Sequence, residues 1–168
     1  MAFDNIANLK EKAINIKFLL LDVDGILTDG KIIIDSYGNE LKSFHIQDGH
    51  GIFLIKSSGI EVGIISGRYS RAVEYRAKEL NIEEVHQGVR DKVKIYEEIK
   101  AKYKLSDEAV AFMGDDLIDI PLLRKVGFSA TTADAVNEVK EIADMITERK
   151  GGEGAVREVI DFILKTMS

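Results

Sequence analysis

The 168-residue sequence contains no cysteine and no tryptophan, and it has a single proline. Without cysteine the protein cannot form a disulfide, use a thiol as nucleophile or hold zinc through thiolates. The longest apolar runs, such as residues 18–21, are far too short to span a bilayer. Residues 1–17 mix acidic and basic side chains and contain no apolar stretch of signal-peptide length. We therefore expect a cytoplasmic protein.

Basic residues are outnumbered, with 23 Lys and Arg against 29 Asp and Glu, and the net charge is −6 at pH 7. Nucleic acids and anionic membranes favour basic surfaces, so this charge argues against both as partners. An acidic enzyme can still bind a phosphorylated substrate, but it then needs a metal ion and local Lys or Arg to offset the repulsion between the charges.

Short apolar runs alternate with amphipathic stretches, which predicts one α/β domain over residues 1–168. We expect buried strands at residues 16–22, 61–66, 82–86 and 109–114. We expect helices at residues 49–57, 70–80 and 92–103. This alternation implies a parallel sheet with right-handed crossovers and helices on both faces. Ligands bind such sheets at the carboxyl ends of the strands, where Asp22, Ser66 and Asp115 fall.

Residues 31–46 interrupt the alternation. Residues 31–34 and 40–46 flank a glycine-containing turn at 36–39, which predicts a β-hairpin. Because the hairpin follows the first carboxylate motif directly, we expect it to act as a flap over a substrate. From about residue 151, glycines precede a terminal helix, and we expect a flexible tail there.

The first candidate motif is Asp22-Val23-Asp24-Gly25, at the end of the first expected strand. Side chains two residues apart on an extended chain point the same way, and the glycine lets the chain turn. In phosphoryl transfer one aspartate can attack phosphorus, while the other protonates the leaving oxygen and then activates water. The alternative is a calcium loop of alternating aspartates, but no suitably placed glutamate follows.

Two further motifs could hold a phosphoryl group. Ser66-Gly67-Arg68 offers a hydroxyl and backbone N–H groups after a strand, although such a segment is also typical of an ordinary turn and helix cap. Lys92, at the start of an expected helix, could neutralise charge on the nucleophile and on the phosphoryl group. It could equally be a solvated lysine, and Arg90 could serve the same purpose from a less determined position.

The fourth motif, Gly114-Asp115-Asp116 followed by Asp119, closes the strand at residues 109–114. Carboxylate oxygens suit Mg²⁺, and Asp115 is the expected direct ligand. Asp116 could bind the metal directly or through water, and Asp119 could cap a helix or support the ligands. Acidic residues this close repel one another unless a cation lies among them. The alternative is a solvated acidic turn.

In their order along the chain, the four motifs resemble those of the haloacid dehalogenase superfamily of phosphatases. The resemblance implies a three-layer α/β/α Rossmann-like fold and a Mg²⁺-dependent phosphatase. It implies that Asp22 is the nucleophile and a metal ligand, and that Asp24 is the general acid and base and binds the metal through its backbone carbonyl. It further implies that Asp115 completes the metal ligands and that Ser66 and Lys92 bind the phosphoryl group.

Residues 22–30, the end of the hairpin (FHIQDG), the SGR motif and the segment GGEGAVREV resemble one subfamily, the 3-deoxy-D-manno-octulosonate 8-phosphate phosphatases. The resemblance implies hydrolysis of that sugar-acid phosphate through an aspartyl phosphate, in the biosynthesis of lipopolysaccharide precursors. It also implies a small hairpin in place of a large cap domain, and a homotetramer whose neighbouring subunits help to close each site.

Three residues are candidates for contact with the sugar acid: Arg68, Thr28 and Arg157. A guanidinium can bind a carboxylate through two hydrogen bonds. Arg68 favours the octulosonate, because relatives that act on nonulosonate 9-phosphates tend to carry an acidic residue there. Arg157 could act in its own site or in a neighbour's, or be a surface arginine. A phosphatase for a nonulosonate or another small sugar phosphate remains an alternative, as does a non-catalytic scaffold or regulator with this fold.

Overall fold

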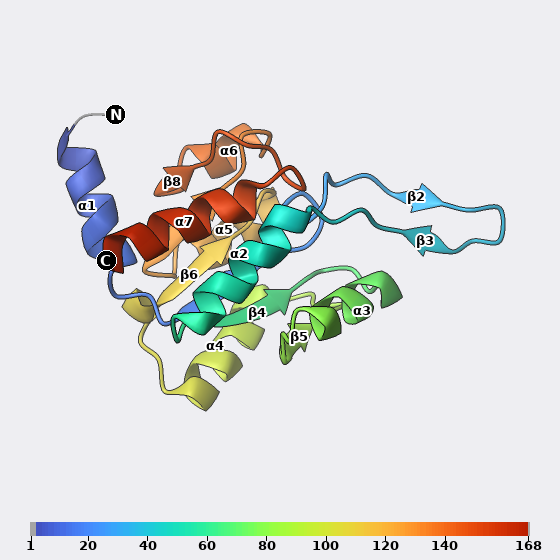
Figure 1. Ribbon diagram of the computed structural model, residues 1–168, viewed down its shortest axis with the longest axis horizontal. Coiled ribbons are helices and arrows are strands. Elements are labelled where there is room, and N and C mark those ends of the chain that lie inside the picture. Colours follow the sequence, from blue (N-terminus) through green and yellow to red (C-terminus); the bar gives the residue numbers. More distant parts are fainter. Residues whose placement is uncertain (1–2, 168) are drawn as a thin grey trace.

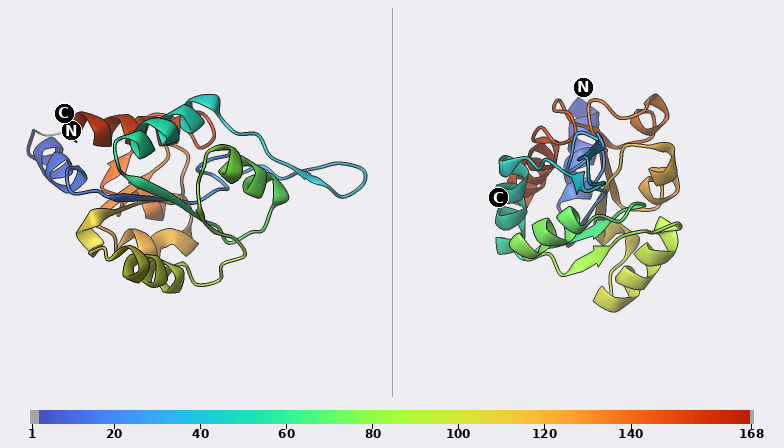
Figure 2. Two further views of the ribbon diagram at one scale, coloured as in Figure 1. Left: turned by 60° about the horizontal axis from the view of Figure 1, so that its bottom comes forward. Right: turned by 90° about the vertical axis from the view of Figure 1, so that its right-hand side faces the viewer.

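The structure is a computed structural model that describes residues 3–167, with side chains from residue 6 onward. A six-stranded sheet runs through its centre, and helices cover both faces (Figures 1 and 2). In spatial order the strands are β5 (Glu84–His86), β4 (Glu61–Ile65), β1 (Phe18–Leu21), β6 (Val110–Met113), β7 (Phe128–Thr131) and β8 (Met145–Ile146). Every neighbouring pair is parallel. The expected three-layer α/β fold is confirmed.

The two faces of the sheet carry separate hydrophobic cores. The helices are α1 (Phe3–Ala13), α2 (Ile46–Ser57), α3 (Arg71–Glu79), α4 (Lys92–Tyr103), α5 (Ile120–Leu123), α6 (Asn137–Lys140) and α7 (Ala155–Met167). On β1, Leu19 and Leu21 pack with α1, α2, α3 and α7, whereas Phe18 and Leu20 pack with α4, α5 and α6. Because side chains alternate along a strand, a strand covered on both faces must be apolar throughout. This is why β1 reads FLLL.

The register of the central strands gathers the candidate residues at one edge of the sheet. Leu21, the last residue of β1, pairs with Ile64 on β4 and with Met113 on β6. Asp22, Ser66 and Asp115 follow these strands within a residue or two, so all three leave the sheet at the same edge. No helix within residues 3–167 is long and apolar enough to cross a membrane.

The hairpin forms a two-stranded antiparallel sheet of β2 (Ile33–Ile34) and β3 (Glu40–Leu41). It extends away from the body of the molecule (Figure 1). Both strands are shorter than expected, and α2 begins at Ile46 instead of residue 49. The reason is a helix cap, because the side chain of His45 accepts the N–H of Gln47 at 3.3 Å and so starts the helix earlier.

The C-terminal helix differs from the expected flexible tail. Val156, Val159, Ile160 and Ile163 of α7 are fully buried in the core shared with α2. The glycines before the helix allow close packing, because a Cβ atom on Gly151 would lie 1.9 Å from the carbonyl oxygen of Gly25. The segment from residue 151 therefore lies against the loop that follows β1, and α7 is part of the domain core.

Candidate active site

A hollow of about 400 Å³ lies at the carboxyl edge of the sheet. Its lining combines acidic, basic and hydroxyl side chains from loops that are distant in sequence. The lining residues are Asp22, Asp24, Gly30, Ser66, Gly67, Arg68, Lys92, Asp115, Asp116 and Ile118. The structure thus brings together all four predicted motifs, each from the end of a strand or the start of a helix.

Asp22 is held rigidly at the floor of this hollow. Its N–H donates to the carbonyl of Met113 at 3.0 Å, and its Oδ1 accepts the N–H of Val23 at 2.7 Å. The residue is only 8% exposed. Burial raises the pKa of Asp22 to about 6; the ammonium of Lys92 opposes this shift and the charge of Asp119 adds to it. A buried, oriented carboxylate facing an open hollow suits an attacking group.

Lys92 joins two buried carboxylates. Its Nζ lies 2.7 Å from Oδ2 of Asp22 and 2.6 Å from Oδ1 of Asp119. It is the first residue of α4, whose N-terminus is capped by the side chain of Asp91. Burial acts to lower the pKa of Lys92, but the two carboxylates more than offset this effect and the pKa lies above its ordinary value. The lysine is therefore a fixed positive charge and not a solvated side chain.

Asp119 organises the acidic loop after β6. It is fully buried, and its Oδ2 accepts the N–H groups of Asp115 at 3.0 Å and Asp116 at 3.2 Å. Its other oxygen faces Lys92. Both oxygens of Asp119 are thus engaged, so its role is to hold the loop and the lysine in place, as expected of a supporting or capping group.

The carboxylates of Asp22, Asp115 and Asp119 form a cluster in which one oxygen of each lies within 4.8 Å of the others. Burial, together with the charges of Asp22 and Asp119, raises the pKa of Asp115 to about 7. One lysine cannot balance three clustered carboxylates, so the donor set fits a hard divalent cation such as Mg²⁺. Asp22 and Asp115 line the hollow, whereas Asp119 is fully buried behind it, so Asp22 and Asp115 are the side chains placed to bind the cation.

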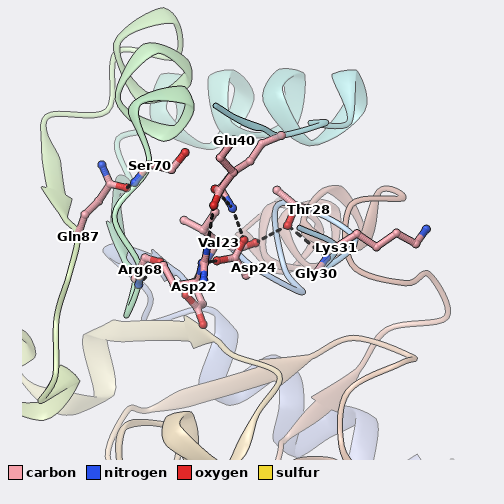
Figure 3. Close-up of polar contacts among 12 residues, drawn as sticks. Asp22, Val23, Asp24, Thr28, Gly30, Lys31, Glu40, Arg68, Ser70 and Gln87 are labelled. Atoms are coloured by element: carbon pink, nitrogen blue, oxygen red, sulfur yellow. Dashed lines mark hydrogen bonds and ion pairs between the residues drawn. The ribbon is translucent and has the colours of Figure 1, made fainter. Parts of the chain in front are cut away.

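Asp24 lies beside this cluster and faces a different set of charges. Its Oδ1 pairs with the ammonium of Lys42, and its Oδ2 lies 3.5 Å from Nε of Arg68. Arg68 is half-exposed at the mouth of the hollow and also contacts Glu40 (Figure 3). Neither Lys42 nor Glu40 was predicted from the sequence. The available signal was their spacing of two residues on an expected strand, which places both on one face.

Ser66 lines the hollow as expected, and it is buried. Its N–H donates to the carbonyl of His86 at 2.8 Å, and its hydroxyl accepts the N–H of Arg68 at 3.4 Å. The next helix, α3, begins only at Arg71, so Ser66 is followed by a loop and not directly by a helix. The end of β4 and this loop therefore fix the position of the Ser66 hydroxyl.

Thr28 and Arg157 lie outside the lining of the hollow. Thr28 is buried, and its hydroxyl donates to the carbonyl of Val23 at 3.4 Å and accepts the N–H of Gly30 at 3.3 Å. It therefore stabilises the loop after β1. Arg157 lines another hollow beside α7, where its Nε pairs with Asp161 at 2.7 Å. The structure therefore does not bring either residue to the lining of this hollow.

Comparison with known proteins agrees with this geometry. Residues 84–160 match the haloacid dehalogenase-like hydrolase family. The chain is 45% identical to the 3-deoxy-D-manno-octulosonate 8-phosphate phosphatase KdsC of Yersinia pestis, over 92% of this chain and 82% of that protein. The Escherichia coli K12 KdsC is also 45% identical, over 94% of this chain and 84% of its own length.

A solved structure of the phosphatase from Moraxella catarrhalis, in complex with magnesium ion, phosphate ion and a KDO molecule, superposes with a TM-score of 0.93. It is 41% identical and covers 98% of this chain and 93% of its own. The match therefore extends over the whole domain and not only over the motifs. The chain belongs to the haloacid dehalogenase-like hydrolases and, within them, to the family of the KdsC phosphatases.

Proposed function

We propose that this protein hydrolyses 3-deoxy-D-manno-octulosonate 8-phosphate to the free sugar acid and inorganic phosphate in a Mg²⁺-dependent reaction that serves lipopolysaccharide biosynthesis. The observation that carries the proposal is the hollow in which Lys92 lies 2.7 Å from Asp22. The identity of 45% to KdsC over nearly the whole chain supports the choice of substrate. We also propose that the protein is cytoplasmic, which cell fractionation would test.

In the proposed reaction Asp22 attacks phosphorus in line and forms an aspartyl phosphate. Asp24 protonates the departing sugar oxygen and then accepts a proton from the water that hydrolyses the intermediate. Ser66 and Lys92 bind the equatorial oxygens and stabilise their charge. The magnesium ion, held by Asp22, Asp115 and the backbone carbonyl of Asp24, supplies Lewis-acid stabilisation of the same oxygens.

A panel of phosphate esters tests the substrate. We expect the wild-type protein with Mg²⁺ to prefer the octulosonate 8-phosphate over a nonulosonate 9-phosphate and over glucose 6-phosphate, which has no carboxylate. Arg68→Ala should raise KM for the octulosonate by about 10- to 100-fold, because a bidentate charged contact is lost, and should leave KM for p-nitrophenyl phosphate nearly unchanged. Preference for the nine-carbon acid would refute the choice of substrate, and turnover of no ester would refute the enzymatic function.

We propose that the protein is a homotetramer whose hairpins associate. Apolar side chains on the hairpin are strongly exposed, including Ile33 at 48%, Ile34 at 62%, Tyr37 at 89% and Leu41 at 54%. An isolated two-stranded hairpin is only marginally stable in water, and a contiguous exposed apolar patch is typical of an interface. A partner subunit there would also exclude water from a site that has only a small flap.

Charge placed on the hairpin should disrupt this assembly. We expect Ile34→Lys to convert the tetramer into smaller species, measured by light scattering coupled to size-exclusion chromatography, because an ammonium cannot be buried there without a partner. Ile14→Lys is the matched control, since Ile14 is 55% exposed but lies outside the hairpin. An unchanged mass for Ile34→Lys, or a monomeric wild-type protein, would contradict the proposed interface.

A further inference from the structure

Four charged side chains form a closed ring beside the hollow. Lys42 pairs with Oδ1 of Asp24, and its Nζ lies 2.9 Å from Oε1 of Glu40. Oε2 of Glu40 lies 2.5 Å from Nη2 of Arg68, and Nε of Arg68 lies 3.5 Å from Oδ2 of Asp24. Each carboxylate therefore has one oxygen on the lysine and the other on the arginine; Figure 3 shows Asp24, Glu40 and Arg68 gathered together.

The ring ties the hairpin to the loop that carries Asp24. Glu40 and Lys42 are two residues apart at β3, so both point toward the body of the molecule. Leu41 between them pairs with Ile33 across the hairpin, and both are exposed. At this end of the hairpin Glu40 and Lys42 thus face the site, and Leu41 and Ile33 lie on the opposite face. A strand that served only as an interface would not need a lysine paired with Asp24 and a glutamate that holds this lysine.

The two cations of the ring differ in burial. The side chain of Lys42 is 1% exposed, whereas that of Arg68 is 48% exposed. Burial acts to lower the pKa of Lys42, but hydrogen bonds to Asp24 and Glu40 more than offset it, and the pKa lies above its ordinary value. Lys42 is therefore a charged and enclosed support, whereas Arg68 can turn toward a substrate without exposing a buried group.

We propose that Lys42 is a positioning residue of the reaction, which holds the carboxylate of Asp24 in the orientation needed to exchange a proton with the leaving oxygen. The inference rests on the proposed phosphatase function, in which Asp24 is the acid and base. Lys42 is absent from the residues that line the hollow, so it acts through Asp24 and not on the substrate. A salt bridge that merely anchored the hairpin would not distinguish between leaving groups, and this difference gives the test.

The test compares two leaving groups. A sugar alkoxide must be protonated as it leaves, whereas p-nitrophenolate leaves without an acid. Hydrolysis of the aspartyl phosphate, in which Asp24 is the base, is common to both substrates, so the test compares kcat/KM, which reports formation of the intermediate and departure of the leaving group. For Lys42→Met at saturating Mg²⁺, we expect kcat/KM on the octulosonate 8-phosphate to fall by about 10- to 100-fold. We expect kcat/KM on p-nitrophenyl phosphate to fall by less than about 3-fold, because the acid is not used in that step.

Matched variants separate positioning from general damage. Lys31→Met removes a lysine that also pairs with an aspartate near the hairpin, Asp29 at 2.8 Å, but whose side chain is 76% exposed; the ratio of the two kcat/KM values should stay at the wild-type level. In the background of Asp24→Asn, adding Lys42→Met should cause no further loss on the sugar phosphate, because the two changes then act through one group.

An equal fall on both substrates, or no fall on either, would overturn the inference. If Lys42→Met does not fold, Glu40→Gln keeps the inference testable, since it removes one of the two carboxylates that hold Lys42 and should lower the same kcat/KM ratio by a smaller factor. If the wild-type protein does not hydrolyse the octulosonate ester, the proposed substrate fails instead, and the ratio is measured with the alkyl phosphate that it hydrolyses best.

Discussion

Replacement of Asp22 by asparagine is expected to reduce phosphatase turnover by at least about 10⁴-fold, because an amide cannot attack phosphorus and form the covalent intermediate. The fold should survive this change. Burial already disfavours the charge of Asp22, as its pKa of about 6 indicates, and Lys92 keeps Asp119 as a partner at 2.6 Å. We therefore expect the melting temperature without Mg²⁺ to be no lower than that of the wild type.

Steady-state kinetics on the octulosonate ester and thermal unfolding together check this prediction. Asp161→Asn is the matched control, because Asp161 is a partly exposed carboxylate on α7 that pairs with Arg157, away from the hollow; its turnover should stay near the wild-type level. Turnover of Asp22→Asn within about tenfold of the wild type would refute Asp22 as the nucleophile, since loss of a nucleophile costs far more.

Replacement of Lys92 by methionine is expected to impair both catalysis and stability. The methionine cannot stabilise the charge of the transferring phosphoryl group, so kcat should fall by about 10²- to 10³-fold. It also leaves Asp22 and Asp119 buried without their cation. Removing one partner of a buried ion pair costs about 3–5 kcal/mol, so urea unfolding should shift to lower concentrations. Added Mg²⁺ should recover part of the loss.

Lys94→Met is the matched control, since Lys94 is exposed on the same helix, α4, and its replacement leaves the ion pairs of Lys92 intact. We expect its unfolding midpoint and kcat to match the wild type within error. If Lys92→Met unfolded at the wild-type urea concentration, the buried pairs would not carry the stability assigned to them. If it also retained wild-type kcat, Lys92 would have no part in the chemistry.

The strands that position the site were predictable because a strand buried on both faces leaves a continuous apolar run. Residues 61–66 were expected to form a strand and contain β4 (Glu61–Ile65), and residues 109–114 contain β6 (Val110–Met113). The strand β7 and the edge strand β8 beside it were not predicted. β8 has only two residues, Met145 and Ile146, and β7 reads FSAT, in which polar residues interrupt the apolar pattern.

The site was predictable where one residue acts close to its own strand end, as Asp22 and Asp115 do. Lys42 was not, because it meets Asp24 only when the second strand of the hairpin returns to the loop after β1. In sequence it is one lysine among many on an exposed segment. The glycine-rich segment at residue 151 was misleading for the same reason, since glycine signals flexibility and close packing alike, and only the contact with Gly25 distinguishes them.

The covalent role of Asp22 is tested most directly by acid quenching during a single turnover, followed by mass spectrometry of the peptides. The Asp24→Asn variant is used beside the wild type, because loss of the base should slow hydrolysis of the intermediate and let it accumulate. We expect one phosphoryl group on the peptide that contains Asp22, removed as phosphate is released. A peptide that stays unmodified in both proteins while phosphate forms, or a phosphoryl group on another residue, would contradict the mechanism.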